Sequence, residues 1–375
     1  MKVLPYSGLV DKKSYTLPGP YTTAAGATIK EVRIGYETIG ELNATRDNAI
    51  LVPHYNSGNS HFAGKYKPDD KAAGYWDAIV GPGKPLDTDK YFLVGVDSLC
   101  NINANDGITV TTGPASIDPD TGKCYGMRFP TVQIRDFVNV QKAVMAHLGI
   151  SKWHAVMGAS MGSMQAFEWA ASFPDLVGRV IGVVPGPHVD DYDALKLRLL
   201  RQMIMLDPKW NGGDYYGTPG PVDGFALALA QMYAYSLAPE WSALYNRKWA
   251  DPAKDPAQSF DNDFASCMWI DAMSKGRIEA GDPNCHMYIQ RANELFTIGG
   301  KPTLEEGLAL IRCKVLLVPS PNDNILYCQH ARKARDILQA QGNHVEYFEI
   351  TGPMGHLNAI FSIQQAAEVI TKFLE

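Results

Sequence analysis

The sequence has few cysteines, and they do not come in closely spaced pairs. Six cysteines are spread over 375 residues, without the Cys-x-x-Cys spacing of zinc or thioredoxin-type sites. An even number would allow a disulfide framework. In a chain of this length without a signal peptide, however, reduced and mostly buried thiols are the better expectation. We therefore predict neither a metal site nor structural disulfides.

Long apolar runs and blocks of positive charge are also missing. No stretch reaches the roughly 18 consecutive apolar residues of a membrane-spanning helix, and the first residues lack the apolar segment of a signal peptide. The net charge is −6, and Lys and Arg are scattered. This argues against nucleic acid or an anionic membrane surface as a partner. We expect a cytoplasmic protein acting on a small molecule.

Short apolar runs bounded by turn residues alternate with segments of helical periodicity. A run that is apolar throughout, such as residues 49–52, is typical of a strand buried on both faces. Alternation of such strands with helices predicts a mostly parallel, doubly wound α/β sheet. Strands are expected at residues 31–37, 49–53, 91–96, 153–157, 177–184, 313–318 and 344–350, and helices at 131–148, 161–172, 328–341 and 362–374.

The alternation stops between residues 186 and 300, where Trp, Tyr, Met and Pro are dense and helical patterns dominate. We interpret residues 1–185 and 301–375 as one α/β core, and residues 186–300 as an inserted helical cap. The aromatic side chains of the cap are expected mainly to pack in its interior.

The sharpest motif is Gly158-Ala159-Ser160-Met161-Gly162, which lies between a predicted strand and a predicted helix. In this context a serine can occupy a tight strand-to-helix turn that exposes its hydroxyl, the nucleophile elbow. The alternative is a serine that only caps the helix. The context favours a nucleophile.

A serine hydroxyl needs a base to take its proton and an acid to orient that base. Asp323 and His356 follow in the order Ser, Asp, His, each just after a predicted strand. Ligands bind at these carboxyl ends in parallel sheets. Asp323 could instead cap a helix, and Asp190 and Asp191 are rival acids near the start of the cap. The order and placement favour Ser160, His356 and Asp323.

Acyl transfer also requires N–H groups that bind the developing oxyanion. One is expected from the residue after the nucleophile, Met161. The second is expected from the loop that follows an early strand. That loop here is residues 54–59 (HYNSGN), and we predict the backbone N–H of Asn56, with Tyr55 as the next choice.

Several further stretches are distinctive, namely residues 36–43 (YETIGELN), 75–77 (YWD), 81–89 (GPGKPLDTD), 112–117 (TGPASI) and 207–215 (DPKWNGGDY). Through these stretches and the elbow, the chain resembles the homoserine O-acetyltransferase group of the α/β-hydrolase superfamily over nearly its whole length. The resemblance implies an α/β-hydrolase fold with a helical lid, the Ser160, His356 and Asp323 triad, and a homodimer formed through cap helices. The resemblance implies no metal or organic cofactor.

The chain departs from the family where the amino-acid substrate is held. The family pattern has an Arg for the substrate carboxylate, a Tyr that assists it, and an Asp directly after the base for the ammonium. Here Gln231, Ala238 and Leu357 stand at those positions. A zwitterion in a water-poor pocket needs partners for both of its charges, so these changes argue against an amino-acid substrate. We expect Tyr55, Gln231 and Leu357 to line the pocket.

The elbow also departs from the family, since Ala159 and Ser163 replace residues that are often Gly. We expect the turn to remain intact and Ser163 to alter the pocket wall slightly.

Three functions were compared on these grounds. The first is a serine esterase that hydrolyses short-chain acyl, especially acetyl, esters of small neutral alcohols. The alternative is an acetyl-CoA-dependent O-acetyltransferase acting on homoserine or another hydroxyl compound, for which His286, Arg291 or Asn293 could supply contacts to the acceptor. A non-enzymatic binding protein is disfavoured by the complete triad. The sequence favours the esterase.

Overall fold

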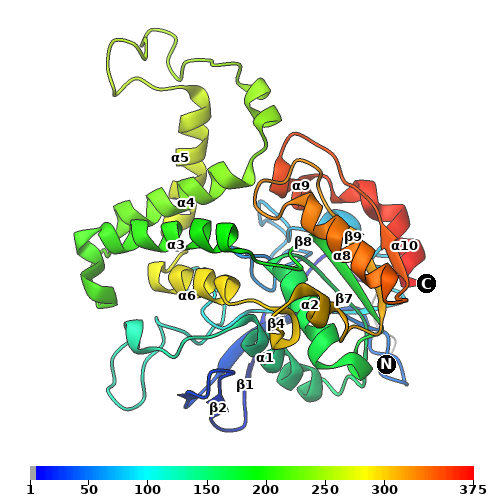
Figure 1. Ribbon diagram of the computed structural model, residues 1–375. Coiled ribbons are helices and arrows are strands. Elements are labelled where there is room, and N and C mark those ends of the chain that lie inside the picture. The colour runs from blue at the N-terminus through cyan, green and yellow to red at the C-terminus, as the bar shows by residue number, and fades with distance from the viewer. Residues whose placement is uncertain (1–5) are drawn as a thin grey trace.

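The computed structural model describes residues 6–375, and an eight-stranded sheet lies at its centre (Figure 1). The strand order is β1-β4-β6-β5-β7-β8-β9-β10. Within this sheet only β4 runs against the other strands, so the predicted mostly parallel sheet is confirmed. The strands are β1 Lys13–Thr16, β4 Arg33–Ile39, β5 Ala49–Leu51, β6 Phe92–Val96, β7 Trp153–Ser160, β8 Arg179–Pro185, β9 Lys314–Val318 and β10 Val345–Tyr347.

Helices cover both faces of the sheet. Side chains of α1 (Ile134–His147), α2 (Met161–Ser172) and α8 (Cys328–Ala340) are buried in one cluster. Side chains of α9 (Asn358–Phe361) and α10 (Ala367–Leu374) are buried in the other cluster. The predicted final helix therefore exists, although it begins as a separate 3-10 turn, Ile363–Ala366.

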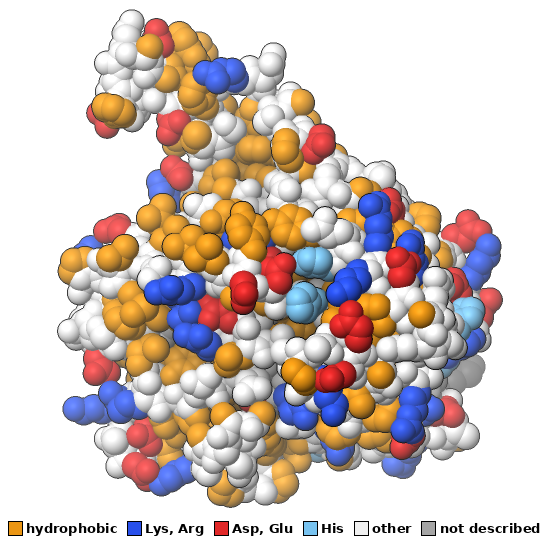
Figure 2. All heavy atoms as spheres, in the orientation of Figure 1, with side chains coloured by type: hydrophobic (Ala, Val, Ile, Leu, Met, Phe, Trp, Pro, Cys, Tyr) orange, Lys and Arg blue, Asp and Glu red, His pale blue; other side chains and the backbone are white. Residues whose placement is uncertain are grey.

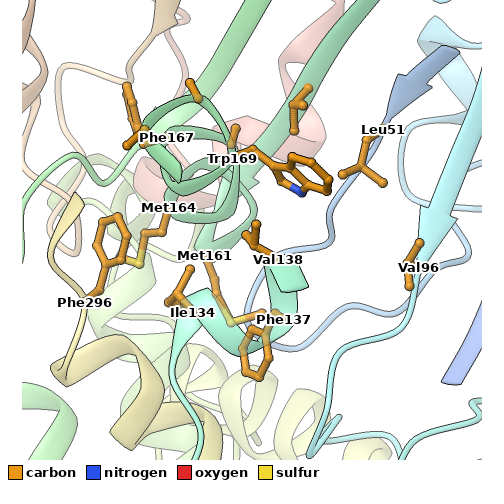
Figure 3. Close-up of a cluster of buried hydrophobic side chains, with 14 of the residues drawn as sticks. Leu51, Val96, Ile134, Phe137, Val138, Met161, Met164, Phe167, Trp169 and Phe296 are labelled. Carbon is orange, nitrogen blue, oxygen red and sulfur yellow. The ribbon is translucent and has the colours of Figure 1, made fainter. Parts of the chain in front are cut away.

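The central strands alternate between these two clusters. In β5, Ala49 and Leu51 point into the cluster under α1 and α2, whereas Ile50 points into the opposite cluster. Figure 3 shows Leu51 and Val96 on the side where the α1 and α2 side chains gather. Because both faces are buried, these strands have almost no polar residues.

Three strands near the N-terminus escaped prediction. The strand β1 is the polar stretch Lys13–Thr16, mostly exposed at the sheet edge, and a small hairpin is formed by β2 (Tyr21–Thr22) and β3 (Thr28–Ile29). Such short, largely exposed strands lack the apolar signal that identifies a central strand.

Four longer helices occupy the chain between β8 and β9, where the sequence predicts the cap. Three of them, α3, α4 and α6, lie together beside the sheet (Figure 1). Helix α6 also packs into the main core, because Tyr288, Ile289 and Ala292 belong to the cluster of α1 and α2. The four helices are α3 Asp191–Leu206, α4 Val222–Ser236, α5 Ala265–Ile278 and α6 Pro283–Glu294.

The loop before α5 and the first turn of α5 stand away from the body of the molecule as an arm, residues 242–268 (Figures 1 and 2), whereas α5 also packs against α4. The arm exposes large apolar side chains, including Leu244 and the fully exposed Phe260.

Two further observations concern predicted absences. All six cysteines are unpaired. Within residues 6–375, no helix combines the length and the apolar character needed to cross a bilayer.

Candidate active site

Ser160 lies at the junction of β7 and α2 in a backbone conformation that L-residues rarely adopt, with φ 55° and ψ −121°. The flanking glycines permit this sharp turn. A Cβ on Gly158 would lie 2.4 Å from the carbonyl of Gly162, and a Cβ on Gly162 would lie 2.2 Å from the Pro53 carbonyl oxygen. Only glycine fits such close backbone approaches. The motif therefore forms the strained elbow expected of an exposed nucleophile.

Three side chains from separate loops meet at this elbow. His356 Nε2 lies 2.9 Å from Ser160 Oγ, and His356 Nδ1 lies 2.7 Å from Asp323 Oδ2. All three residues are at least nine-tenths buried. The distances suit proton transfer from the hydroxyl to the imidazole, with the carboxylate orienting the ring.

Asp323 is held by its own loop. Its Oδ1 accepts hydrogen bonds from the backbone N–H groups of Ile325 (2.8 Å) and Leu326 (3.0 Å), which leaves Oδ2 for the histidine. The rival acid Asp190 instead caps α3 by accepting the N–H of Asp193. The structure thus brings Asp323, and not Asp190, to His356.

Ser163, which was expected to alter the pocket wall, has a different place. Its hydroxyl donates to the Ser160 carbonyl (2.6 Å) and accepts the N–H of Gly186 (2.9 Å), and it is completely buried. It does not line the cavity. Ser163 therefore ties the strained elbow to the end of β8.

Two backbone N–H groups are candidates for binding the oxyanion. Met161 is the first residue of α2, where an N–H has no partner within the helix. The N–H of Asn56 has no backbone acceptor within residues 6–375. Met161, Asn56 and Tyr55 all line the cavity that contains Ser160. The oxyanion hole of Met161 and Asn56 stays a prediction.

Buried polar side chains fix the loop that carries Asn56. The amides of Asn56 and Gln290 exchange two hydrogen bonds of 3.3 Å. His54 donates through Nδ1 to the Tyr55 carbonyl and accepts through Nε2 from Asn101. Burial lowers the pKa of His54, so its neutral form holds these bonds. Neither residue was singled out from the sequence, because Gln290 lies on the distant α6 and His54, in the same loop as Asn56, acts only by holding that loop.

The cavity above Ser160 has a volume of about 190 Å³ and is mostly apolar. Tyr55 and Leu357 line it, as the sequence predicts. Other apolar lining residues are Ala159, Met164, Val189, Leu197, Leu200, Met232, Met273, Ile325, Leu326, Ala359, Ile360 and Phe361. A small apolar cavity suits a compact substrate.

Gln231 does not line this cavity, so the prediction that placed it there was wrong. Helix α4 meets the cavity through Met232, Tyr233, Tyr235 and Ser236. Gln231 lies one turn before Tyr235, but it is not among the residues that line the cavity. Among the cap residues considered for acceptor contacts, Asn293 lines the cavity, whereas His286 and Arg291 do not.

Charged side chains do line the cavity, although none stands at the three positions where the family holds its amino-acid substrate. Arg277 of α5 lines the cavity, as do Lys196 and Asp193 of α3. The latter two form an ion pair of 2.9 Å. Burial raises the pKa of the Tyr55 hydroxyl, and the nearby Arg277 charge opposes this rise. Nothing in the sequence distinguishes Arg277 from the exposed Lys275 two residues earlier, because only folding brings α5 over the elbow.

One group of side chains has the composition of a cation site. Potential ligand atoms of Asp190, Asp193 and His330 lie within 4.8 Å of one another. The Lys196 ammonium already lies against Asp193, and a metal ion would compete with this charge. We assign no metal to this group.

Comparisons with known proteins agree with the geometry. A family model described as the alpha/beta hydrolase fold matches residues 111–340. A homoserine O-acetyltransferase of Methanococcoides burtonii is 36% identical over 98% of this chain and 74% of its own length. The crystal structure of esterase E22 is 40% identical with a TM-score of 0.94, covering 98% of this chain and all of its own. A homoserine O-acetyltransferase structure from Bacillus anthracis is 35% identical with a TM-score of 0.92, covering 98% of each chain.

Proposed function

The chain belongs to the α/β-hydrolase superfamily and, within it, to the homoserine O-acetyltransferase-like group, and from this premise we propose that it is a serine esterase for short-chain acyl esters. Members of this group carry both names, acetyltransferase and esterase. The substrate pocket must therefore distinguish the two activities.

The first half of the proposed reaction uses the triad. Ser160 Oγ attacks the ester carbonyl while His356 Nε2 takes the hydroxyl proton. The N–H groups of Met161 and Asn56 bind the negative oxygen of the tetrahedral intermediate. His356 then gives its proton to the departing alcohol, which leaves an acyl group on Ser160.

The second half decides between hydrolysis and transfer. In hydrolysis, His356 takes a proton from water while the water oxygen attacks the acyl-serine, and His356 then returns the proton to Ser160 Oγ as the acid leaves. In transfer, the hydroxyl of a second substrate replaces water. The triad serves both reactions equally, so only the ability of the cavity to hold an acceptor discriminates between them.

The observation that carries the esterase proposal is the absence of a site for an ammonium group. Leu357 lines the cavity beside His356, where the family pattern has an acid. Of the described residues that line the cavity, Asp193 is the one acid, and Lys196 already neutralises it. An amino-acid acceptor would leave its ammonium unpaired in an enclosed site, at a cost of several kcal/mol. Water needs no such partner.

The acetyltransferase is the second candidate, and Arg277 is the observation that favours it. A guanidinium in the cavity could hold the carboxylate of homoserine. The ammonium would still have no partner among the described cavity residues, and for this reason we place the esterase first.

Two parallel assays test the proposal. The purified protein is incubated with ethyl acetate and aryl acetates, following acid release, and with acetyl-CoA plus homoserine, following free thiol. We expect acid release from the acetates and no homoserine-dependent thiol. Homoserine-dependent thiol release at a rate comparable to ester hydrolysis would instead establish the transferase. In both assays Ser160→Ala should be inactive, and unchanged turnover would remove Ser160 as the nucleophile.

A further inference from the structure

Arg277 is held rigidly in the cavity wall by two hydrogen bonds. Its Nε donates to the Tyr233 hydroxyl (2.7 Å), and its Nη1 donates to the Ser57 carbonyl oxygen (2.9 Å). The guanidinium also interacts with the Tyr55 hydroxyl. The guanidinium is thus fixed between α4 and the loop of Asn56, with donor capacity left over.

This cation also lacks a counter-ion. No carboxylate of residues 6–375 lies within 4.0 Å of Arg277, whereas the buried Arg201 is paired with Glu294 at 2.7 Å. The one acid in the same cavity, Asp193, is paired with Lys196. A charge removed from water is costly unless it is paired. An arginine without a partner in an active-site cavity is therefore suited to an anionic ligand.

We propose that Arg277 binds a carboxylate on the substrate, so that the preferred substrates are esters carrying a carboxylate group and no ammonium group. This inference rests on the proposed esterase activity and specifies its substrate class. The guanidinium and the Ser160 hydroxyl open into one cavity, so a single small molecule can present its ester to the serine and its carboxylate to the arginine. The planar guanidinium suits a carboxylate better than a neutral group.

The carboxylate can be on either side of the ester bond. In a half-ester of a dicarboxylic acid it is part of the acyl group, and in an acylated hydroxy acid it is part of the alcohol. Monomethyl succinate and 3-acetoxypropanoate represent these two sources. Dimethyl succinate and 3-acetoxypropanamide are their neutral counterparts, with nearly the same shape.

The experiment compares kcat and KM for these four esters in the wild type, Arg277→Met and Lys275→Met. The control removes a positive charge from the exposed side of the same helix. We expect the wild type to prefer one or both anionic esters. Arg277→Met should lower kcat/KM for the preferred anion about 10- to 100-fold, mainly through KM. Neutral esters should change less than about threefold, and Lys275→Met should behave as wild type. Arg277→Lys should restore part of the loss.

Each alternative gives a distinct result. Equal losses for anionic and neutral esters would show that Arg277 only holds the Asn56 loop, and this would overturn the proposal. A wild type without any preference for the anions would overturn it too. If the wild type hydrolyses none of the esters, the esterase assignment itself fails. Calorimetry with the Ser160→Ala variant then tests carboxylate binding by Arg277 separately from catalysis. Succinate monoamide, which carries a carboxylate, should bind, and the neutral succinamide should not.

Discussion

Replacing Ser163 by alanine tests how the strained elbow is held. The Ser163 hydroxyl is completely buried and joins two backbone groups, the carbonyl of Ser160 and the N–H of Gly186. Alanine removes the hydroxyl with minimal change of shape. The N–H of Gly186 then loses its acceptor in a site without access to solvent. The Ser160 carbonyl keeps the first intrahelical hydrogen bond of α2, which it accepts as the N-cap residue.

The size of the effect follows from the orphaned Gly186 N–H. A buried polar group left without a partner costs about 1–3 kcal/mol. Ser163→Ala should therefore lower the free energy of unfolding by about 1–3 kcal/mol. The unfavourable φ of Ser160 is itself worth about 1–3 kcal/mol, so relaxation of the turn is expected to relieve part of the loss. Relaxation would displace the hydroxyl from His356 and lower kcat for ester hydrolysis by about 10-fold or more.

Urea unfolding followed by tryptophan fluorescence measures the stability, and acetate hydrolysis measures kcat. Ser242→Ala is the matched control, because its hydroxyl donates one exposed hydrogen bond, to Pro239; it should stay within about 0.5 kcal/mol of wild type. If Ser163→Ala unfolds at the wild-type urea concentration with unchanged kcat, the hydroxyl does not hold the elbow.

Three further predictions concern the acid, a buried histidine and the arm. Asp323→Asn should lower kcat of ester hydrolysis about 10⁴-fold, because an amide does not hold the required tautomer of His356; a loss below tenfold contradicts the assignment. Burial lowers the pKa of His286 to about 3, so below pH 6.5 the unfolded chain binds a proton at this residue that the folded protein does not, and the stability falls with the pH. This histidine accounts for about 2 kcal/mol of the loss in unfolding free energy between pH 7 and pH 5. Urea titrations of His286→Asn should lack this share, and an equally steep fall would refute it. Finally, we propose that two copies associate through the arm, so Phe260→Asp with Leu244→Asp should shift the sedimenting species from dimer to monomer, whereas a monomeric wild type would exclude this interface.

The central strands and the helices around them could be predicted because each carries its signal locally. Residues 49–52 are apolar throughout since β5 is buried on both faces. The elbow was recognisable because Gly158 and Gly162 are required by close backbone approaches to a few neighbouring atoms. Asp323 and His356 could be selected by their places after strands, because parallel strands end at one edge of the sheet.

The pocket wall could not be predicted in the same way. Gln231 was assigned to the cavity from its place in an aligned segment, but the neighbouring Met232 and Tyr233 line the cavity instead. Arg277 and Gln290 reach the site from α5 and α6, more than 110 residues after Ser160. No motif surrounds either residue in the sequence. Their hydrogen-bond partners, the Ser57 carbonyl and the Asn56 side-chain amide, are far away in the chain, so a local pattern does not reveal them.

The sequence by itself determined the order of strands and helices, the glycine-flanked serine and the choice of its acid and base. These depend on burial patterns and on steric limits that act between near neighbours. Only the tertiary structure decided which charges face the substrate, because that depends on how the helices between β8 and β9 lie over the elbow. The Arg277 guanidinium, which has no counter-ion within residues 6–375, reaches the cavity of Ser160 through that packing, and the electrostatics of the cavity follow from it.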